Sequence, residues 1–194
     1  MERRQAKHNP AREGYSLLTR DDLATARNDF HHACGQLYVH ANNRFIEYLD
    51  DPSSSSGENI DVAEARSMIT KYINIYPEAD HYSLSPHDIH PDHSAVGTAL
   101  LGLFSEGRIQ TKIQFFISMA TRLEYEKNNK PIPGNGSKET PNHPKMKDLV
   151  LNACRCYSAW APSQGAYAIG YHSVAPQFWR FAANPFHQNC RQEE

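Results

Sequence analysis

The most constraining feature of the sequence is a short histidine-rich segment between a predicted strand and a predicted helix. Residues 87–93 contain three histidines and two aspartates, and an apolar run follows at once. Residues 81–85 are bounded by turn residues and are typical of a short buried strand that ends at this motif. The run after the motif has helical spacing of its apolar residues, at Val96, Leu100, Leu103 and Phe104. The segment therefore predicts a strand, a polar loop and a helix in succession.

The side chains of this motif suit metal binding or acid–base chemistry. Neutral imidazole is the commonest protein ligand for zinc. Carboxylates either bind the zinc as further ligands or orient the imidazoles by accepting the N–H of the other ring nitrogen. His90 and His93 are three positions apart, so in a first helical turn they lie on one face. Asp88 or His87 can join them as local metal ligands. A polar, solvated loop ahead of a helix is the alternative interpretation of the same residues.

Composition and charge exclude several kinds of partner. The chain has 194 residues, enough for a single domain with a sizeable core, and its formal net charge is -2. That charge provides no basic footprint for nucleic acid or for an anionic membrane surface. The N-terminal residues contain no apolar stretch, so neither a signal peptide nor a membrane span is expected, and the predicted location is cytoplasmic. The four cysteines favour reduced, mostly buried thiols.

Helices and strands alternate along the rest of the chain. Capping patterns and apolar spacing predict three further helices, over residues 19–37, 61–75 and 146–160. The clearest strand is predicted over residues 109–117, and residues 166–174 are expected to hold one or two more. Residues 127–144 are rich in proline, glycine and asparagine, which predicts a long loop of the kind that forms lids or binding loops.

This alternation predicts an α/β fold with a layered, mostly parallel sheet. In such sheets, ligands bind outside the carboxyl ends of the strands. The strand predicted over residues 81–85 leads directly into the histidine motif, so the motif is expected at such an end. That position favours a functional site over a plain solvated loop.

The motif and its flanks carry a family resemblance, in the runs Asp88-Ile89-His90-Pro91-Asp92-His93, Ala95-Val96-Gly97 and Ala99-Leu100. Together these runs resemble the second signature of the PIG-L/LmbE-type de-N-acetylases. Residues 18–30 are similar to a helix of that family, and residues 166–174 resemble the end of some bacterial members. The resemblance thus covers most of the chain in the expected order. The family is zinc-dependent and removes acetyl groups from N-acetylglucosamine-containing substrates.

The resemblance implies a fold, a cofactor and a role for several residues. The fold would be a single domain over residues 1–194, with a three-layer Rossmann-like (LmbE-like) sheet and helices on both faces. The cofactor would be zinc, with His93 as a ligand, and the substrate a small-molecule or glycoconjugate amino sugar. His90 would face the substrate carbonyl, to stabilise the oxyanion or protonate the leaving amine, and Asp92 would orient the His90 imidazole. Arg27 is similar to the family arginine that helps bind substrate; the oligomeric state is not implied.

The sequence departs from the family at one signature. Family members open with a strand ending in Ala-His-Pro-Asp-Asp-Glu, which supplies two zinc ligands and the general base, and this motif does not occur here. The chain resembles the family with its first β-α-β unit removed. A catalytic zinc has about three protein ligands, so Asp88 is a candidate to join His93 as a metal ligand. The alternative function is a catalytically inactive sugar-binding or metal-binding remnant of the same fold.

Overall fold

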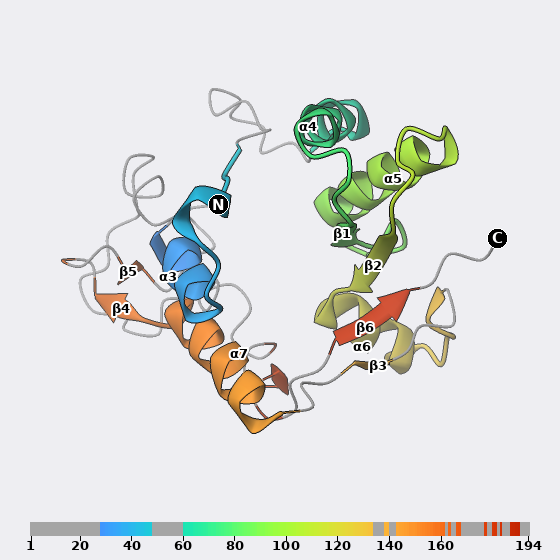
Figure 1. The fold of residues 1–194 in the computed structure, drawn as a ribbon. Coiled ribbons are helices and arrows are strands. Elements are labelled where there is room, and N and C mark those ends of the chain that lie inside the picture. The colour runs from blue at the N-terminus through green and yellow to red at the C-terminus, as the bar shows by residue number, and fades with distance from the viewer. Residues whose placement is uncertain are drawn as a thin grey trace. The chain divides into compact units, whose positions relative to one another are not determined.

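The chain folds into two compact units in a computed structural model (Figure 1). The structure describes residues 28–47, 60–133, 138–139, 143–161, 163, 166–167, 177, 180–181, 183 and 187–190. One unit comprises Met1–Ile46 and Thr140–Phe186, and the other comprises Glu47–Glu139 and His187–Glu194. The histidine motif belongs to the second unit. The single domain expected over residues 1–194 stays a prediction.

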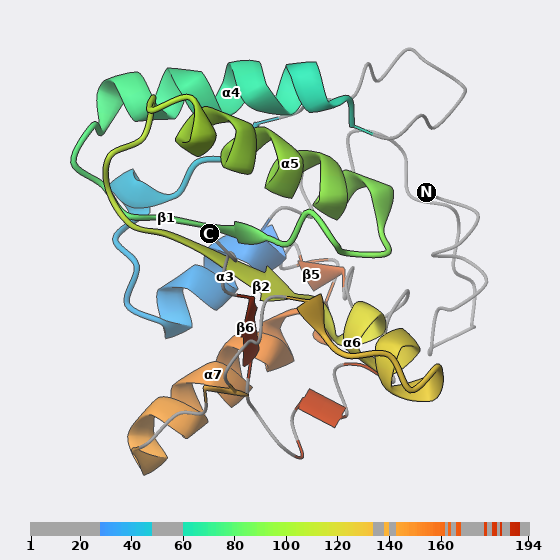
Figure 2. The ribbon, with the colours of Figure 1, turned by 90° about the vertical axis from the view of Figure 1, so that its right-hand side faces the viewer.

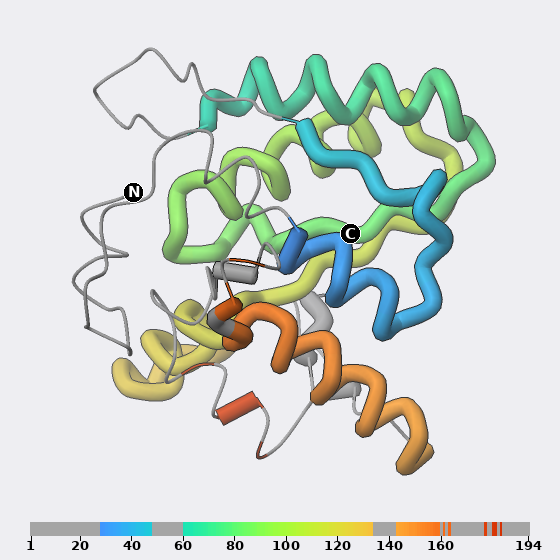
Figure 3. The backbone as a smooth tube through the Cα atoms, turned by 90° about the vertical axis from the view of Figure 1, so that its left-hand side faces the viewer, coloured from blue at the N-terminus to red at the C-terminus, as the bar shows by residue number. Residues whose placement is uncertain are grey.

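The first unit is built on two helices, α3 (Asn28–Gln36) and α7 (Pro144–Cys156), which pack against each other (Figure 3). A short 3-10 helix, η1 (Ala41–Asn43), follows α3. The guanidinium of Arg44 donates hydrogen bonds to the carbonyls of Val39 and His31 and so ties this turn to α3. A two-stranded antiparallel ribbon, β4 (Trp160–Ala161) with β5 (Ala166–Tyr167), completes the described part of this unit. Arg27 lies just before α3, outside the described residues.

Two helices of the second unit, α4 (Val62–Ile75) and α5 (Pro91–Ser105), lie in the segments where the sequence predicts helices. α4 starts with a capping box, in which the side chains of Asp61 and Glu64 bond to each other's backbone N–H groups. α5 begins inside the histidine motif, with His90 as its N-cap and Pro91 to His93 in its first turn. α4 and α5 pack side by side (Figure 2). With β2 they enclose an apolar cluster whose buried members are Ile73, Leu100, Leu103, Ile109, Phe115 and Ile117.

The sheet of the second unit is mixed, with strand order β1-β2-β6-β3. β1 (His81–Leu84) and β2 (Ile113–Ile117) are parallel, whereas β6 (His187–Cys190) runs antiparallel to both β2 and β3 (Lys138–Glu139). The prediction of a mostly parallel sheet is therefore wrong for the described strands. Between β3 and β6 the chain passes through the first unit, so no β-α-β crossover fixes the direction of β6. The described residues confirm a mixture of helices and strands, and the three-layer Rossmann-like sheet stays a prediction.

Two local features of this unit differ from the predicted pattern. The strand expected over residues 109–117 begins only at Ile113, because the Thr111 hydroxyl and the Lys112 N–H bond instead to residues 79 and 80 in the turn before β1. The sequence pattern also does not predict helix α6 (Met119–Lys127), which Ser118 caps. Within the described residues, no helix has the length and apolar character needed to cross a membrane.

Candidate functional site

The histidine motif forms a tightly bonded loop between β1 and α5. Each backbone N–H from residue 85 to residue 90, apart from the proline, has a partner. The acceptors, in chain order, are the Phe116 carbonyl, the Ser85 hydroxyl, the Ser85 carbonyl, the Thr121 hydroxyl and the Asp88 carboxylate. Buried backbone groups need such partners to avoid a desolvation penalty. The motif is therefore an ordered connection, and the alternative of a plain solvated loop does not describe its backbone.

Helix α5 lies directly against this loop. A Cβ atom at Gly97 would lie 2.5 Å from the Leu84 carbonyl oxygen and 2.5 Å from the Pro86 nitrogen, so only glycine permits the approach. The Ser94 hydroxyl donates to the Pro86 carbonyl at 2.8 Å. These contacts fix the first turns of α5, and the histidines they carry, relative to the end of β1.

Asp88 is the buried centre of the site. Its side chain has no exposed surface; Oδ1 accepts from the His90 N–H at 3.0 Å and lies 3.2 Å from Nδ1 of His93. Oδ2 accepts from the Ser118 N–H at 2.9 Å. Burial raises the pKa of this carboxyl, but the hydrogen bonds from His93, His90 and Ser118 outweigh it and hold the pKa well below its ordinary value. Asp88 is therefore an ionised carboxylate at neutral pH.

The imidazoles of His90 and His93 lie side by side. Their ring centroids are 4.6 Å apart with an interplanar angle of 28°. The Nδ1 atoms have different partners: Nδ1 of His93 faces the Asp88 carboxylate, whereas Nδ1 of His90 accepts the Asp92 N–H at 3.3 Å and caps α5. Both side chains are partly exposed. The two histidines that the sequence singles out are thus brought together at the carboxyl end of β1.

Asp92 does not hold the His90 ring in the way that the resemblance implies. Its Oδ2 lies 3.7 Å from Nδ1 of His90, beyond hydrogen-bond distance, and its Oδ1 accepts from the Ile60 N–H at 2.9 Å. His90 is oriented instead by the backbone of the helix that it caps. The carboxylate of Asp92 ties the segment before α4 to the start of α5.

Ser118 and Thr121 are site residues that the sequence analysis does not identify. Thr121 is fully buried; its hydroxyl accepts from the Ile89 N–H at 2.9 Å and from the Ser118 hydroxyl at 3.0 Å. A serine followed by a helical segment does indicate an N-cap. Nothing in the local pattern, however, indicates that this cap meets a loop about thirty positions earlier in the chain.

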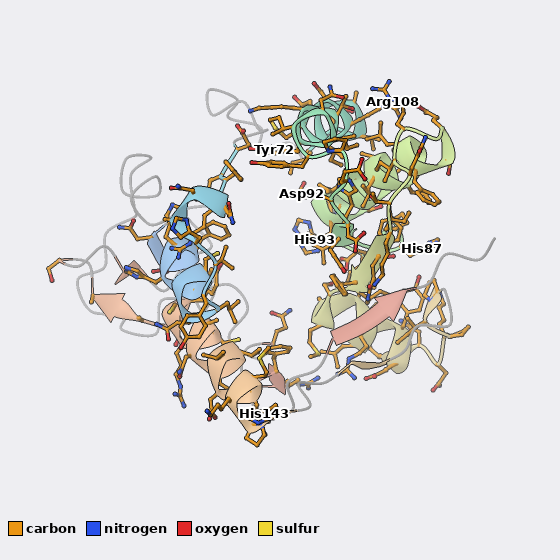
Figure 4. All side chains as sticks on the ribbon, in the orientation of Figure 1. Tyr72, His87, Asp92, His93, Arg108 and His143 are labelled. Atoms are coloured by element: carbon orange, nitrogen blue, oxygen red, sulfur yellow. The ribbon has the colours of Figure 1, made fainter. Side chains whose placement is uncertain are left out.

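A zinc centre of the kind that the resemblance implies needs about three protein ligands. Across residues 28–47, 60–133 and the later described segments, no group of three or more His, Cys, Asp or Glu side chains is placed to hold a metal ion. His87 is exposed, and Figure 4 shows it on a different side of the segment from His93. An imidazole whose Nδ1 bonds to a carboxylate is a typical metal ligand through Nε2. His93 therefore fits one ligand position, and zinc stays a prediction.

A small cavity of about 170 Å³ lies elsewhere in the second unit, between β1 and helices α4 and α5. Apolar and aromatic side chains provide most of its lining, including Ile69, Tyr72, Val96 and Leu100.

Comparison with known proteins gave no match: no family model, no curated protein and no solved structure matches the chain. The residues of the site are therefore the basis for a function.

Proposed function

We propose that residues 85–93 form part of a zinc-dependent hydrolase site of the PIG-L/LmbE type, which removes an N-acetyl group from an N-acetylglucosamine-type substrate. The substrate would be a small-molecule or glycoconjugate amino sugar. The proposal includes the three-layer Rossmann-like sheet of that family, and the cytoplasmic location expected from the sequence stays a prediction. A single observation carries the proposal: Nδ1 of His93 faces the Asp88 carboxylate, whereas Nδ1 of the adjacent His90 accepts the Asp92 N–H.

The protonation of each Nε2 atom follows from the Nδ1 partner. A carboxylate only accepts hydrogen bonds, so in neutral His93 the proton is on Nδ1 and Nε2 keeps a lone pair. The backbone N–H of Asp92 only donates, so Nδ1 of neutral His90 is the acceptor and Nε2 carries the proton. His93 is thereby suited to bind a metal ion and His90 to donate a hydrogen bond, 4.6 Å apart from ring to ring.

Amide hydrolysis uses both kinds of group. A donor beside the carbonyl oxygen stabilises the negative charge that develops there, and the same proton can be passed to the leaving amine. We assign this donor role to Nε2 of His90 and a metal-binding role to Nε2 of His93. Zinc, when bound, supplies Lewis-acid polarisation of the carbonyl and a more acidic water. Arg27, which would contribute to substrate binding, lies outside the described residues.

A second candidate function is a catalytically inactive sugar-binding or metal-binding module. It is favoured by the structural roles that His90 and Asp92 already have. His90 caps α5, and Asp92 binds the Ile60 N–H, so both residues have a reason to be present without any reaction. This candidate retains His93 as a metal ligand and predicts no acetate release.

Acetate release by the purified full chain tests the proposal. The chain is supplied with Zn²⁺ and N-acetylglucosamine, and acetate is measured with and without a chelator. We expect release that the chelator abolishes, that His93→Ala and His90→Asn lose, and that His143→Asn retains, because His143 is a capping histidine outside the site. Zinc that binds through His93 without acetate release favours the second candidate. Acetate release that is unaffected by His93→Ala contradicts both.

A further inference from the structure

We propose that Asp88 is a positioning residue that sets the tautomer of His93, and that the N-terminus of α6 holds Asp88 in place for this purpose. The inference deepens the proposed function, and it rests on that function only where His93 is taken to bind a metal ion. It also changes the role expected for Asp88, from a metal ligand to a residue that acts through His93.

The Asp88 carboxylate already has several hydrogen-bond partners. Its oxygens already take the N–H groups of His90 and Ser118 and face Nδ1 of His93, and its side chain is fully buried. To bind a metal ion directly, the carboxylate would have to give up some of these bonds in a buried place, which is costly. Its partners instead leave Asp88 suited to orienting the imidazole in front of it.

The two histidines differ in the partner of their Nδ1 atom. Side by side at the start of α5, His90 and His93 have different Nδ1 partners. His90 faces a backbone donor, which leaves the proton on Nε2. His93 faces an acceptor, which places the proton on Nδ1 and the lone pair on Nε2. The difference comes from the two partners, the Asp92 N–H on His90 and the Asp88 carboxylate on His93.

Hydrogen bonds from the start of α6 hold Asp88 and the residue after it in place. The Ser118 N–H bonds to Oδ2 of Asp88, and the Thr121 hydroxyl takes the N–H of Ile89, the next residue along. The Ser118 hydroxyl joins the two by donating to the Thr121 hydroxyl and accepting the Thr121 N–H. The rotamer of Asp88 is thus held from a second element, as orienting carboxylates beside functional imidazoles generally are.

The tautomers can be measured by nitrogen NMR of the histidine rings at a pH where the imidazoles are neutral. In the wild-type full chain we expect the proton of His93 on Nδ1 and that of His90 on Nε2; the spectrum of His93→Ala identifies the His93 signals. Wild-type His93 with its proton on Nε2 would overturn the proposal without any variant. Asp88→Ala is expected to move the His93 proton to Nε2, and Asp92→Ala, which also removes a carboxylate that accepts a backbone N–H, is expected not to.

Zinc affinity separates this inference from the proposed function. With Zn²⁺ alone as the probe, Asp88→Ala should weaken binding about 10–100-fold, as loss of an orienting partner does, and Asp92→Ala should leave it unchanged. Equal weakening in both variants contradicts the positioning role. A His93 tautomer that depends on Asp88 in a chain that binds no Zn²⁺ supports the positioning role and refutes the proposed function. Where Asp88→Ala does not fold, the wild-type tautomer still decides.

Discussion

The N-termini of α5 and α7 make an informative comparison because both begin with the same dipeptide. His90-Pro91 opens α5 and His143-Pro144 opens α7. In each case the histidine Nδ1 accepts the N–H two residues on, at 3.3 Å and 3.2 Å, and proline occupies the first helical turn. The dipeptide is therefore a helix start in both places, and its histidine has a structural role before it has any other.

The difference between the two helix starts lies in what surrounds the cap. The third helical residue is His93 in α5 and Met146 in α7, where it is 51% exposed. Two residues before the cap, α5 has the buried Asp88, whereas the sequence before α7 has Pro141. A capping histidine alone thus does not indicate a catalytic or metal-binding site. The second imidazole and the buried carboxylate are what distinguish the start of α5.

The largest expected effect comes from separating α5 from the loop that it contacts. Gly97→Ala should lower the free energy of unfolding by about 3 kcal/mol, because the new Cβ overlaps backbone atoms of residues 84–86. Gly102→Ala in the same helix is the control: its nearest neighbour is the flexible end of Arg66 at 3.3 Å, and alanine should stabilise the helix by up to about 1 kcal/mol. Denaturant unfolding measures both. Equal effects would show that the close approach at Gly97 is unimportant.

The buried carboxylate should appear in the pH dependence of stability. The pKa of Asp88 is lowered in the folded chain, so its stabilisation is complete above the unfolded value of about 3.9 and is lost as the pH falls below it. Denaturant midpoints measured from neutral to acidic pH should fall less steeply in Asp88→Asn than in wild type. Asp92→Asn, which retains Asp88, should keep the wild-type slope. An unchanged acid slope in Asp88→Asn would contradict the ionised, buried state of this group.

The hydrogen bonds from α6 should contribute somewhat less to the free energy of unfolding than the close approach at Gly97. Thr121→Val leaves the buried Ile89 N–H without its acceptor and should cost about 1–3 kcal/mol, whereas Thr121→Ser keeps the hydroxyl and should recover part of it. Thr70→Val is the matched control, because the Thr70 hydroxyl only donates back to the Arg66 carbonyl within α4. Unfolding free energies decide the comparison. A larger loss at residue 70 than at residue 121 would argue against the α6 anchor.

The smallest effect on stability is expected at the two histidine N-caps, those of α5 and α7. His90→Asn and His143→Asn should each change the unfolding free energy by less than about 0.5 kcal/mol, since asparagine is a favourable N-cap residue. Thermal or denaturant unfolding measures this pair. A marked destabilisation by His90→Asn alone would show that the stacked ring, and not the cap, stabilises the start of α5.

Much of the second unit can be predicted from local sequence. The capping box of Asp61 and Glu64, the helix with Val96, Leu100, Leu103 and Phe104, and the short strand before the motif all depend on neighbouring residues, and all are present. The direction of β6 could not be predicted, because it depends on where the chain re-enters the unit. The zinc site and the substrate stay predictions of the family resemblance.

The sequence by itself determined that two histidines would share one face at the start of a helix that follows a strand, since that outcome needs only spacing and capping. Only the tertiary structure decided what each histidine can do. The Nδ1 partner of His90 comes from its own helix turn, but the carboxylate facing His93 is held by the Ser118 N–H, 30 positions away in the chain. The tautomer of each imidazole depends on its Nδ1 partner, and the contact with Ser118 holds the Asp88 carboxylate in place beside His93.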